Sequence, residues 1–182
     1  MRKVRAAINM TLDGFCDHTS VTPDEEIHQH FADALDGAGV ILYGRITYQL
    51  MLFWKTLIDQ PSGEKSMDDF AIAIDRIPKI VFSRTMKDSG WESATLATKP
   101  LEECVMELKQ QTGGDILVGC RSLIIQLLKA NLIDELQICL HPVIAGGGLP
   151  LFEDLTMRKE LNLIKSKSFA SGAVALYYQP SN

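Results

Sequence analysis

The sequence lacks the features of a membrane-spanning or secreted protein. Its apolar runs, such as residues 39–43, fall far short of the ~20 residues that a membrane-spanning helix needs. The first residues are basic, but Asn9 and Asp13 follow where a signal peptide would have its apolar core. The four cysteines form no C-x-x-C pair and no zinc-ribbon spacing, so we expect thiols that are buried in a reducing compartment. We therefore expect a cytoplasmic protein that does not bind membranes.

A basic surface is also missing. The chain has 182 residues, and 18 Lys and Arg stand against 23 Asp and Glu, which gives a formal net charge of −5 with neutral histidines. Proteins that bind nucleic acids need a basic stripe to neutralise phosphates, so this balance disfavours nucleic acid as a partner. No linker, charge block or repeat divides the sequence. We therefore expect a single domain over residues 1–182.

Histidines are few, and their spacing does not suggest a metal site. His28 and His30 are two positions apart on a predicted helix, so their side chains point in different directions. No third ligand is evident near them, and structural zinc sites need four. We expect no bound metal.

Short apolar runs alternate with helical patterns along most of the chain. The strands predicted from these runs are 3–9, 40–43, 79–82, 95–97, 116–118 and 136–140, with a hairpin of 161–169 and 173–179 at the end. Thr22 and Glu25 form a predicted capping box around Pro23 at the start of the first helix, and Ser66 is predicted to cap a later helix that ends at Pro78. This order predicts an α/β fold with three layers: a mostly parallel central sheet with an antiparallel C-terminal hairpin, and helices on both faces.

Three predicted strand-to-helix junctions carry glycine or arginine, namely 44–47, 83–85 and 119–122. The carboxyl ends of parallel strands share one edge of a sheet, so these junctions are predicted to converge there. Glycine allows close approach of the backbone, a helix N-terminus attracts phosphate, and arginine offers it a planar fork. This predicts a phosphorylated or nucleotide ligand near Arg45, Arg84 and Arg121, the alternative being ordinary turns with solvated arginines.

The best-known nucleotide-binding motifs are absent. No G-x-G-x-x-G follows the first strand, and no G-x-x-x-x-G-K-[ST] occurs, which disfavours a Rossmann site and a P-loop. Asp13 follows the first strand and has two interpretations, a carboxylate that orients a heterocycle or helps to deliver a proton, or one half of an Asp-Gly turn. Residues 146–148 are three glycines that form either a phosphate-binding turn or a flexible bend.

Six segments in order along the chain resemble the dihydrofolate reductase-like family, in particular the C-terminal reductase domain of bacterial riboflavin biosynthesis. They are Leu12-Asp13-Gly14, Leu42-Tyr43-Gly44-Arg45-Ile46-Thr47-Tyr48, Val81-Phe82-Ser83-Arg84-Thr85, Ile116-Leu117-Val118-Gly119, Leu132-Ile133-Asp134-Glu135-Leu136 and His141-Pro142-Val143-Ile144-Ala145-Gly146-Gly147-Gly148. The resemblance implies an NADPH-dependent reductase of a pyrimidine- or pteridine-like heterocycle, similar to 5-amino-6-(5-phosphoribosylamino)uracil reductase. The alternatives are dihydrofolate reductase activity, a catalytically inactive nucleotide-binding protein and a flavin-binding domain. By family analogy we also expect a homodimer, with the apolar hairpin as its interface.

The resemblance further implies a role for individual residues. Asp13 would be the catalytic polar group nearest the reacting centre. The other implied residues contact NADPH: Ala7, Ile8 and Gly14 at the nicotinamide; Gly44, Arg45 and Thr47 at the phosphates; Ser83 and Arg84 at the 2′-phosphate; Gly119, Cys120, Arg121, Ser122 and Leu123 at the pyrophosphate and nicotinamide side.

The sequence also departs from the family pattern in three places. Gly119-Cys120 stands where the family often has two adjacent glycines joined by a cis peptide. The first helix opens with Asp24, Glu25 and Glu26 and lacks the acidic residue that holds the pterin in dihydrofolate reductases, which disfavours dihydrofolate reduction. The zinc deaminase signature of the bifunctional riboflavin enzyme is absent, so this chain supplies at most the reductase half.

Overall fold

The computed structural model describes residues 1–153 and 155–181, and it contains an eight-stranded sheet in the order β4-β3-β2-β5-β1-β6-β8-β7. Neighbouring strands from β4 to β6 are parallel, whereas β8 runs antiparallel to β6 and β7 antiparallel to β8. The strands are β1 Val4–Thr11, β2 Ala38–Gly44, β3 Lys79–Phe82, β4 Ala94–Leu96, β5 Asp115–Val118, β6 Glu135–His141, β7 Leu161–Ser168 and β8 Val174–Pro180. The helices are α1 Glu25–Asp36, α2 Arg45–Asp59, α3 Lys65–Arg76, α4 Leu101–Gln110 and α5 Arg121–Lys129. This arrangement confirms the predicted fold.

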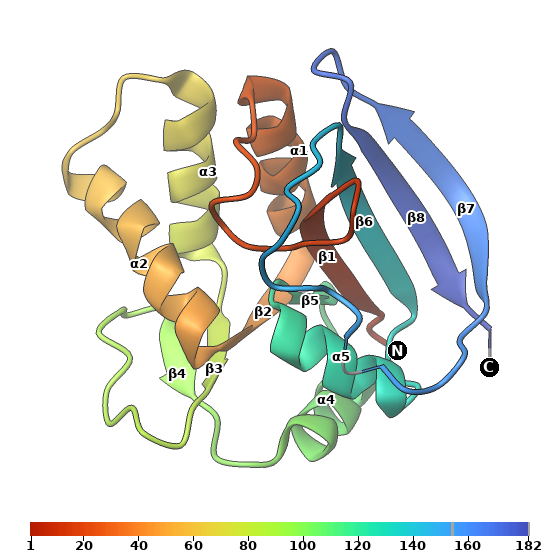
Figure 1. The fold of residues 1–182 in the computed structure, drawn as a ribbon. Coiled ribbons are helices and arrows are strands. Elements are labelled where there is room, and N and C mark those ends of the chain that lie inside the picture. Colours follow the sequence, from red (N-terminus) through yellow and green to blue (C-terminus); the bar gives the residue numbers. More distant parts are fainter. Residues whose placement is uncertain (154, 182) are drawn as a thin grey trace.

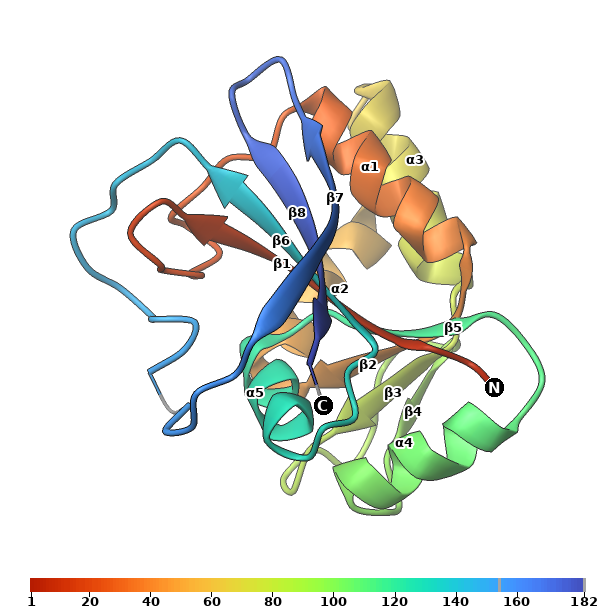
Figure 2. The same cartoon turned by 90° about the vertical axis from the view of Figure 1, so that its right-hand side faces the viewer.

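Helices cover the sheet on both faces, as Figures 1 and 2 show. Alternate residues of a strand point to opposite faces, and β2 displays this directly. Val40 and Leu42 belong to the core beneath α4 and α5, whereas Ile41 and Tyr43 belong to the core beneath α1, α2 and α3. A strand buried on both faces must be apolar throughout, which explains why residues 40–43 form an unbroken apolar run.

The start of α1 differs from the prediction. Asp24, not Thr22, caps α1, because its carboxylate accepts a hydrogen bond from the backbone N–H of Ile27 at 2.9 Å. Pro23 therefore lies before the helix and not at its first position.

The predictions for α3 and β4 were also inexact. Ser66 lies buried in the first turn of α3, and Glu64 occupies the cap position. The turn before α3 is held by Asp68, whose carboxylate accepts a hydrogen bond from the backbone N–H of Ser62 at 2.8 Å. The helix therefore begins at Lys65, two residues before the start that a Ser66 cap predicts. Strand β4 is likewise shifted by one residue from the predicted 95–97.

The four cysteines are free thiols, of which Cys120 and Cys139 are buried and Cys16 and Cys104 are half-buried. None of the described helices is both long enough and apolar enough to cross a bilayer. Within the described residues every peptide bond is trans, including the one between Gly119 and Cys120.

Candidate functional site

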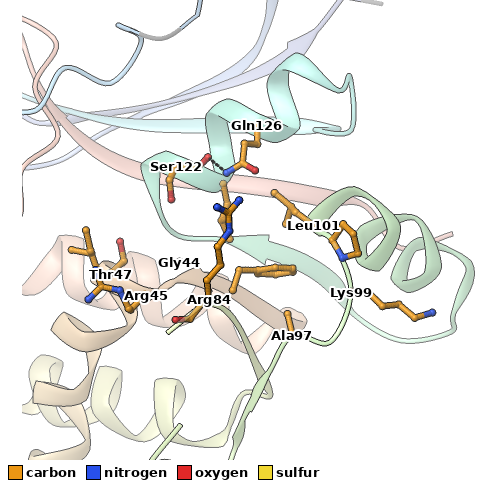
Figure 3. A pocket seen from close by; sticks show the side chains of 14 residues that line it. Gly44, Arg45, Thr47, Arg84, Ala97, Lys99, Leu101, Ser122 and Gln126 are labelled. Atoms are coloured by element: carbon orange, nitrogen blue, oxygen red, sulfur yellow. Dashed lines mark hydrogen bonds between the residues drawn. The ribbon is translucent and has the colours of Figure 1, made fainter. Parts of the chain in front are cut away.

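A cavity of about 620 Å³ lies at the carboxyl ends of β2, β3 and β4, where α2, α4 and α5 begin (Figure 3). Its volume is typical of small-molecule sites, which are about 300–1,000 Å³. The sheet edge it occupies is where open α/β sheets bind their ligands. The lining residues are Gly44, Arg45, Ile46, Thr47, Phe82, Ser83, Arg84, Ala97, Lys99, Pro100, Leu101, Ser122, Leu123 and Gln126.

Three helices present their N-terminal ends to this cavity. Gly44, Pro100 and Cys120 occupy the cap positions of α2, α4 and α5, and none of these caps has a side-chain hydrogen bond. The first N–H groups of a helix have no partner within the helix, and together with the helix dipole they form a partial positive charge. Because no side chain satisfies these groups, the three helix starts make this cavity suited to an anion.

The charged side chains of the lining point to the same conclusion. The lining contains Arg45, Arg84 and Lys99 and no carboxylate. Lys99 pairs with Glu103 at 3.4 Å and with Glu107, and in Figure 3 its side chain is directed away from the other labelled residues. By contrast, the structure shows no hydrogen bond or ion pair between Arg84 and any other described residue, so its guanidinium is available to a ligand.

Arg45 and Ser83 have local contacts that leave them able to bind a ligand. The Arg45 guanidinium donates to Gln49 at 3.2 Å and is otherwise exposed. The Ser83 hydroxyl oxygen accepts the backbone N–H groups of Thr85 and Met86 at 3.2 and 3.1 Å, which shapes the turn after β3. Its own O–H remains a donor.

The floor of the cavity is formed by the close approach of β2 and α5. The Gly44 N–H donates to the Cys120 sulfur at 3.1 Å, and a Cβ at Gly44 would lie 3.0 Å from the Ser122 hydroxyl. A Cβ at Gly119 would lie 3.0 Å from the buried Tyr43 ring. Burial raises the pKa of the Cys120 thiol, so the thiol stays neutral beneath the site. These two glycines therefore allow the close packing of β2 against the start of α5 and of the segment after β5 against Tyr43.

The cavity brings together seven of the residues that the sequence analysis proposed for cofactor binding. They are Gly44, Arg45, Thr47, Ser83, Arg84, Ser122 and Leu123. Arg121 is not among the lining residues, and its Nε donates to the Pro150 carbonyl oxygen at 2.5 Å, so its contact with a ligand stays a prediction. The chain after β6 returns to α5 and places the Pro150 carbonyl beside the Arg121 side chain. The spacing of residues in the sequence cannot reveal this contact.

The sequence analysis missed the contribution of β4 and α4. Ala97, Lys99, Pro100 and Leu101 form a fourth junction at the cavity, but β4 has three residues and no glycine follows it directly. The available signal was Pro100 just before a helical pattern, which marks a helix start.

Ala7, Ile8, Asp13 and Gly14 lie outside the cavity. Ala7 and Ile8 belong to β1, the strand beside β5, and Ile8 is part of the core beneath α5. Gly14 has a φ of 94°, which only glycine adopts without strain, so Asp13-Gly14 forms a tight turn after β1. These residues therefore lie along the same sheet edge as the cavity, on the β1 side.

The Asp13 carboxylate is fully engaged by its neighbours. It accepts hydrogen bonds from the Thr11 hydroxyl at 2.7 Å and from the backbone N–H groups of Ala145 and Gly146 at 3.0 and 2.8 Å. These bonds, the Thr11 bond first, lower the pKa of Asp13 to about 2, so the group is ionised at neutral pH and cannot donate a proton. The geometry favours the turn interpretation and adds a second role, as an anchor for the glycines that follow β6.

The two histidines of α1 do not share a site. The His28 ring contacts Trp54 at 5.7 Å between centroids, and the His30 ring contacts Phe169 at 5.2 Å. Within residues 1–153 and 155–181 no three His, Cys, Asp or Glu side chains are grouped so that they could hold a metal ion.

Comparisons with known proteins agree with this fold. The RibD C-terminal domain family matches residues 2–175. The Bacillus subtilis protein named "Uncharacterized protein YyaP" is 33% identical over 181 residues, which cover 97% of this chain and 94% of that protein. A solved protein from Shewanella sp. PV-4, named "Putative riboflavin biosynthesis protein", superimposes with a TM-score of 0.74 at 22% identity, over 99% of both chains.

A further similar structure is a diaminohydroxyphosphoribosylaminopyrimidine deaminase/5-amino-6-(5-phosphoribosylamino)uracil reductase from Thermotoga maritima. It has a TM-score of 0.65 at 14% identity. The match covers 99% of this chain and 57% of that protein, so this chain corresponds to one part of the longer protein. At this identity the likeness shows the fold.

Proposed function

The chain belongs to the RibD C-terminal domain family, and from this we propose that it is an NADPH-dependent reductase of a pyrimidine- or pteridine-like heterocycle. The family is a reductase domain of riboflavin biosynthesis proteins. The observation that carries the proposal is the cavity, where three helix starts and two arginines meet without any carboxylate in the lining.

The lining fits the anionic parts of NADPH. The starts of α2 and α5, with Gly44, Arg45, Thr47 and Ser122, would hold the diphosphate, because helix N-termini and an arginine favour phosphate oxygens. Ser83 and Arg84, at the end of the neighbouring strand β3, would hold the 2′-phosphate that distinguishes NADPH from NADH.

When bound, NADPH supplies a hydride for a C=N or C=O group of the substrate. The protein would mainly position the reactants. Ala7 and Ile8 on β1 would lie beside the nicotinamide, on the strand next to β5. Asp13 would act as a positioning residue, because it fixes the glycines that follow β6 against the turn after β1.

A fluorescence titration of the protein with NADPH and, in parallel, with NADH tests the proposal. We expect clearly tighter binding of NADPH. If neither cofactor binds, the reductase proposal is wrong. If NADPH binds and no heterocycle is reduced, the protein is a nucleotide-binding protein without catalysis.

We also propose that two copies associate through the C-terminal hairpin. Strand β7 forms the edge of the sheet, and Leu163 and Ile164 on it are 56% and 52% exposed. An exposed apolar edge strand is a ready partner for a second chain. Light scattering should show a dimer in the wild type and a monomer in the Leu163→Asp/Ile164→Asp variant, whereas a monomeric wild type would refute the proposal.

A further inference from the structure

The proposed function places the substrate on one part of the sheet edge, and the inference about the substrate's charge rests on that function. The cavity spans the ends of β4, β3 and β2 and the start of α5, which follows β5. Strands are spaced about 4.8 Å apart, so an extended cofactor with its phosphates in this cavity directs its nicotinamide to β1, the next strand along. The substrate must then lie beyond it, at the ends of β1 and β6 and beside α1.

The segments that form most of this part of the edge contain no lysine or arginine. The sequence contains no Lys or Arg in residues 6–44, which include most of β1, the turn after it, α1 and β2. It contains none in residues 130–157, which include β6 and the glycines that follow it, and none after residue 167. Asp13, Asp17 and Asp24 lie in these segments, so their local charge is negative.

The cations around these segments have contacts of their own. Lys165 and Lys167 of β7, on the α1 side, lie over the rings of Tyr177 and Phe169, with Nζ 4.2 and 4.8 Å from the ring centroids. Arg121 holds the Pro150 carbonyl at 2.5 Å, and Lys55 donates to the Gly90 carbonyl at 2.6 Å. Lys65 pairs with Asp69, and Arg76 ends α3 just before β3 begins, at the opposite edge of the sheet. Proteins bind phosphate groups with Arg or Lys, so this side of the site does not offer what a phosphorylated substrate needs.

The edge does offer neutral hydrogen-bonding groups. Asn9 on β1 and His141 at the end of β6 lie side by side, with His141 Nε2 2.9 Å from Asn9 Oδ1. His141 is buried and Asn9 is partly exposed. With Oδ1 accepting from His141, the Asn9 amide nitrogen keeps both of its N–H groups without a partner among the described residues.

We propose that the substrate carries no phosphate and is a neutral planar heterocycle, whose carbonyl oxygen or ring nitrogen accepts a hydrogen bond from the Asn9 amide. His141 is the positioning residue that sets the orientation of this amide. The Thermotoga maritima reductase is named for a phosphoribosylamino substrate. The substrate proposed for this chain differs from that compound in lacking the phosphate.

The first test compares two substrates that differ only in the phosphate. NADPH oxidation is measured with 5-amino-6-(5-phosphoribosylamino)uracil and with the corresponding dephosphorylated riboside. We expect kcat/KM for the riboside to be higher by about tenfold or more, because a dianion meets acidic groups without a cation. A preference for the phosphorylated compound would overturn the proposal.

If neither compound is reduced, binding measurements decide whether the site accepts a neutral heterocycle or a phosphorylated ligand. Thermal unfolding is measured on protein saturated with NADP⁺, with the riboside, 7,8-dihydropterin or ribose 5-phosphate added. We expect the two heterocycles to raise the Tm and ribose 5-phosphate to leave it unchanged. A shift with ribose 5-phosphate, or no shift with either heterocycle, contradicts the proposal. Failure of the proposed function itself is recognised separately, because NADPH would then not bind in the fluorescence titration.

Variants test the assignment of Asn9. Asn9→Asp replaces the donor by an acceptor, and we expect KM for the neutral substrate, or its Kd, to rise about tenfold while the NADPH Kd stays within about twofold. Gln111→Glu makes the same change of charge at an exposed position at the end of α4 and serves as the control. Asn9→Ser keeps a hydrogen-bond donor and should lose less substrate affinity than Asn9→Asp. His141→Gln should retain more affinity than His141→Leu, since glutamine can still donate to Asn9. Unchanged substrate affinity in a folded Asn9→Asp variant would refute the assignment.

Discussion

Replacing Arg84 with glutamine should remove the preference for NADPH while leaving NADH binding unchanged. Arg84 lines the cavity, is exposed, and has no hydrogen bond or ion pair to any other described residue. A charge-assisted hydrogen bond contributes about 1.5–3 kcal/mol, and solvent screening at an exposed site reduces this to about 1–2 kcal/mol. The Arg84→Gln variant should therefore bind NADPH about 5- to 30-fold more weakly.

The assay is a fluorescence titration of both cofactors with wild type and variant, at low and at high salt. The wild-type preference for NADPH should shrink as salt rises, because the arginine and the phosphate are both close to water. Lys99→Gln is the matched control. Its ammonium already pairs with Glu103 and Glu107, so its loss should change either affinity by less than about twofold.

Two results would refute this reasoning. An equal loss of NADPH and NADH affinity in Arg84→Gln would mean that Arg84 contacts the shared diphosphate or supports the fold. A larger loss of NADPH affinity in Lys99→Gln than in Arg84→Gln would mean that the 2′-phosphate lies toward α4 and not at the end of β3.

Three further predictions concern stability. Gly119→Ala puts a Cβ 3.0 Å from the buried Tyr43 ring and should lower the free energy of unfolding by about 1–3 kcal/mol in urea, and an unchanged midpoint would contradict this. Burial lowers the pKa of Lys79 from 10.5 to about 8, so the unfolded state binds more protons between these values. The free energy of unfolding of the wild type, relative to that of Lys79→Met, should therefore rise with pH across that window. A difference between the two proteins that does not change with pH would refute this prediction. Burial also lowers the pKa of His28 and His141 below 6.5, so stability should fall as the pH drops below that value, and thermal unfolding at stepped pH would show it.

Much of the fold was predictable because its signals are local. Residues 40–43 are apolar throughout since β2 is covered on both faces, and the same reasoning holds for residues 116–118 of β5. Gly44 and Arg45 could be placed at the cavity because a strand end, a glycine and a helix start follow one another directly in sequence. Patterns of this kind need no knowledge of distant residues.

The errors and omissions concern contacts between residues far apart, or details of side-chain reach. Asp24 and Thr22 both suit a helix cap, and only the bond from the Ile27 N–H decides between them. Arg121 looked equivalent to Arg45 and Arg84 until the chain after β6 placed the Pro150 carbonyl beside it. Asn9 and His141 are 132 positions apart, so no spacing rule could pair them.

The distribution of charge along the sheet edge unites these observations. The cavity at β2 to β4 contains cations and no carboxylate, whereas the segments that form the β1 and β6 side contain carboxylates and no cation. An extended anionic cofactor can lie across such an edge in one direction only, with its phosphates in the cavity and its uncharged end toward β1. The same asymmetry keeps a free nucleotide from occupying the substrate side. Reversing it locally with Leu12→Lys, at an exposed position after β1, should therefore improve binding of phosphorylated heterocycles without changing the NADPH Kd.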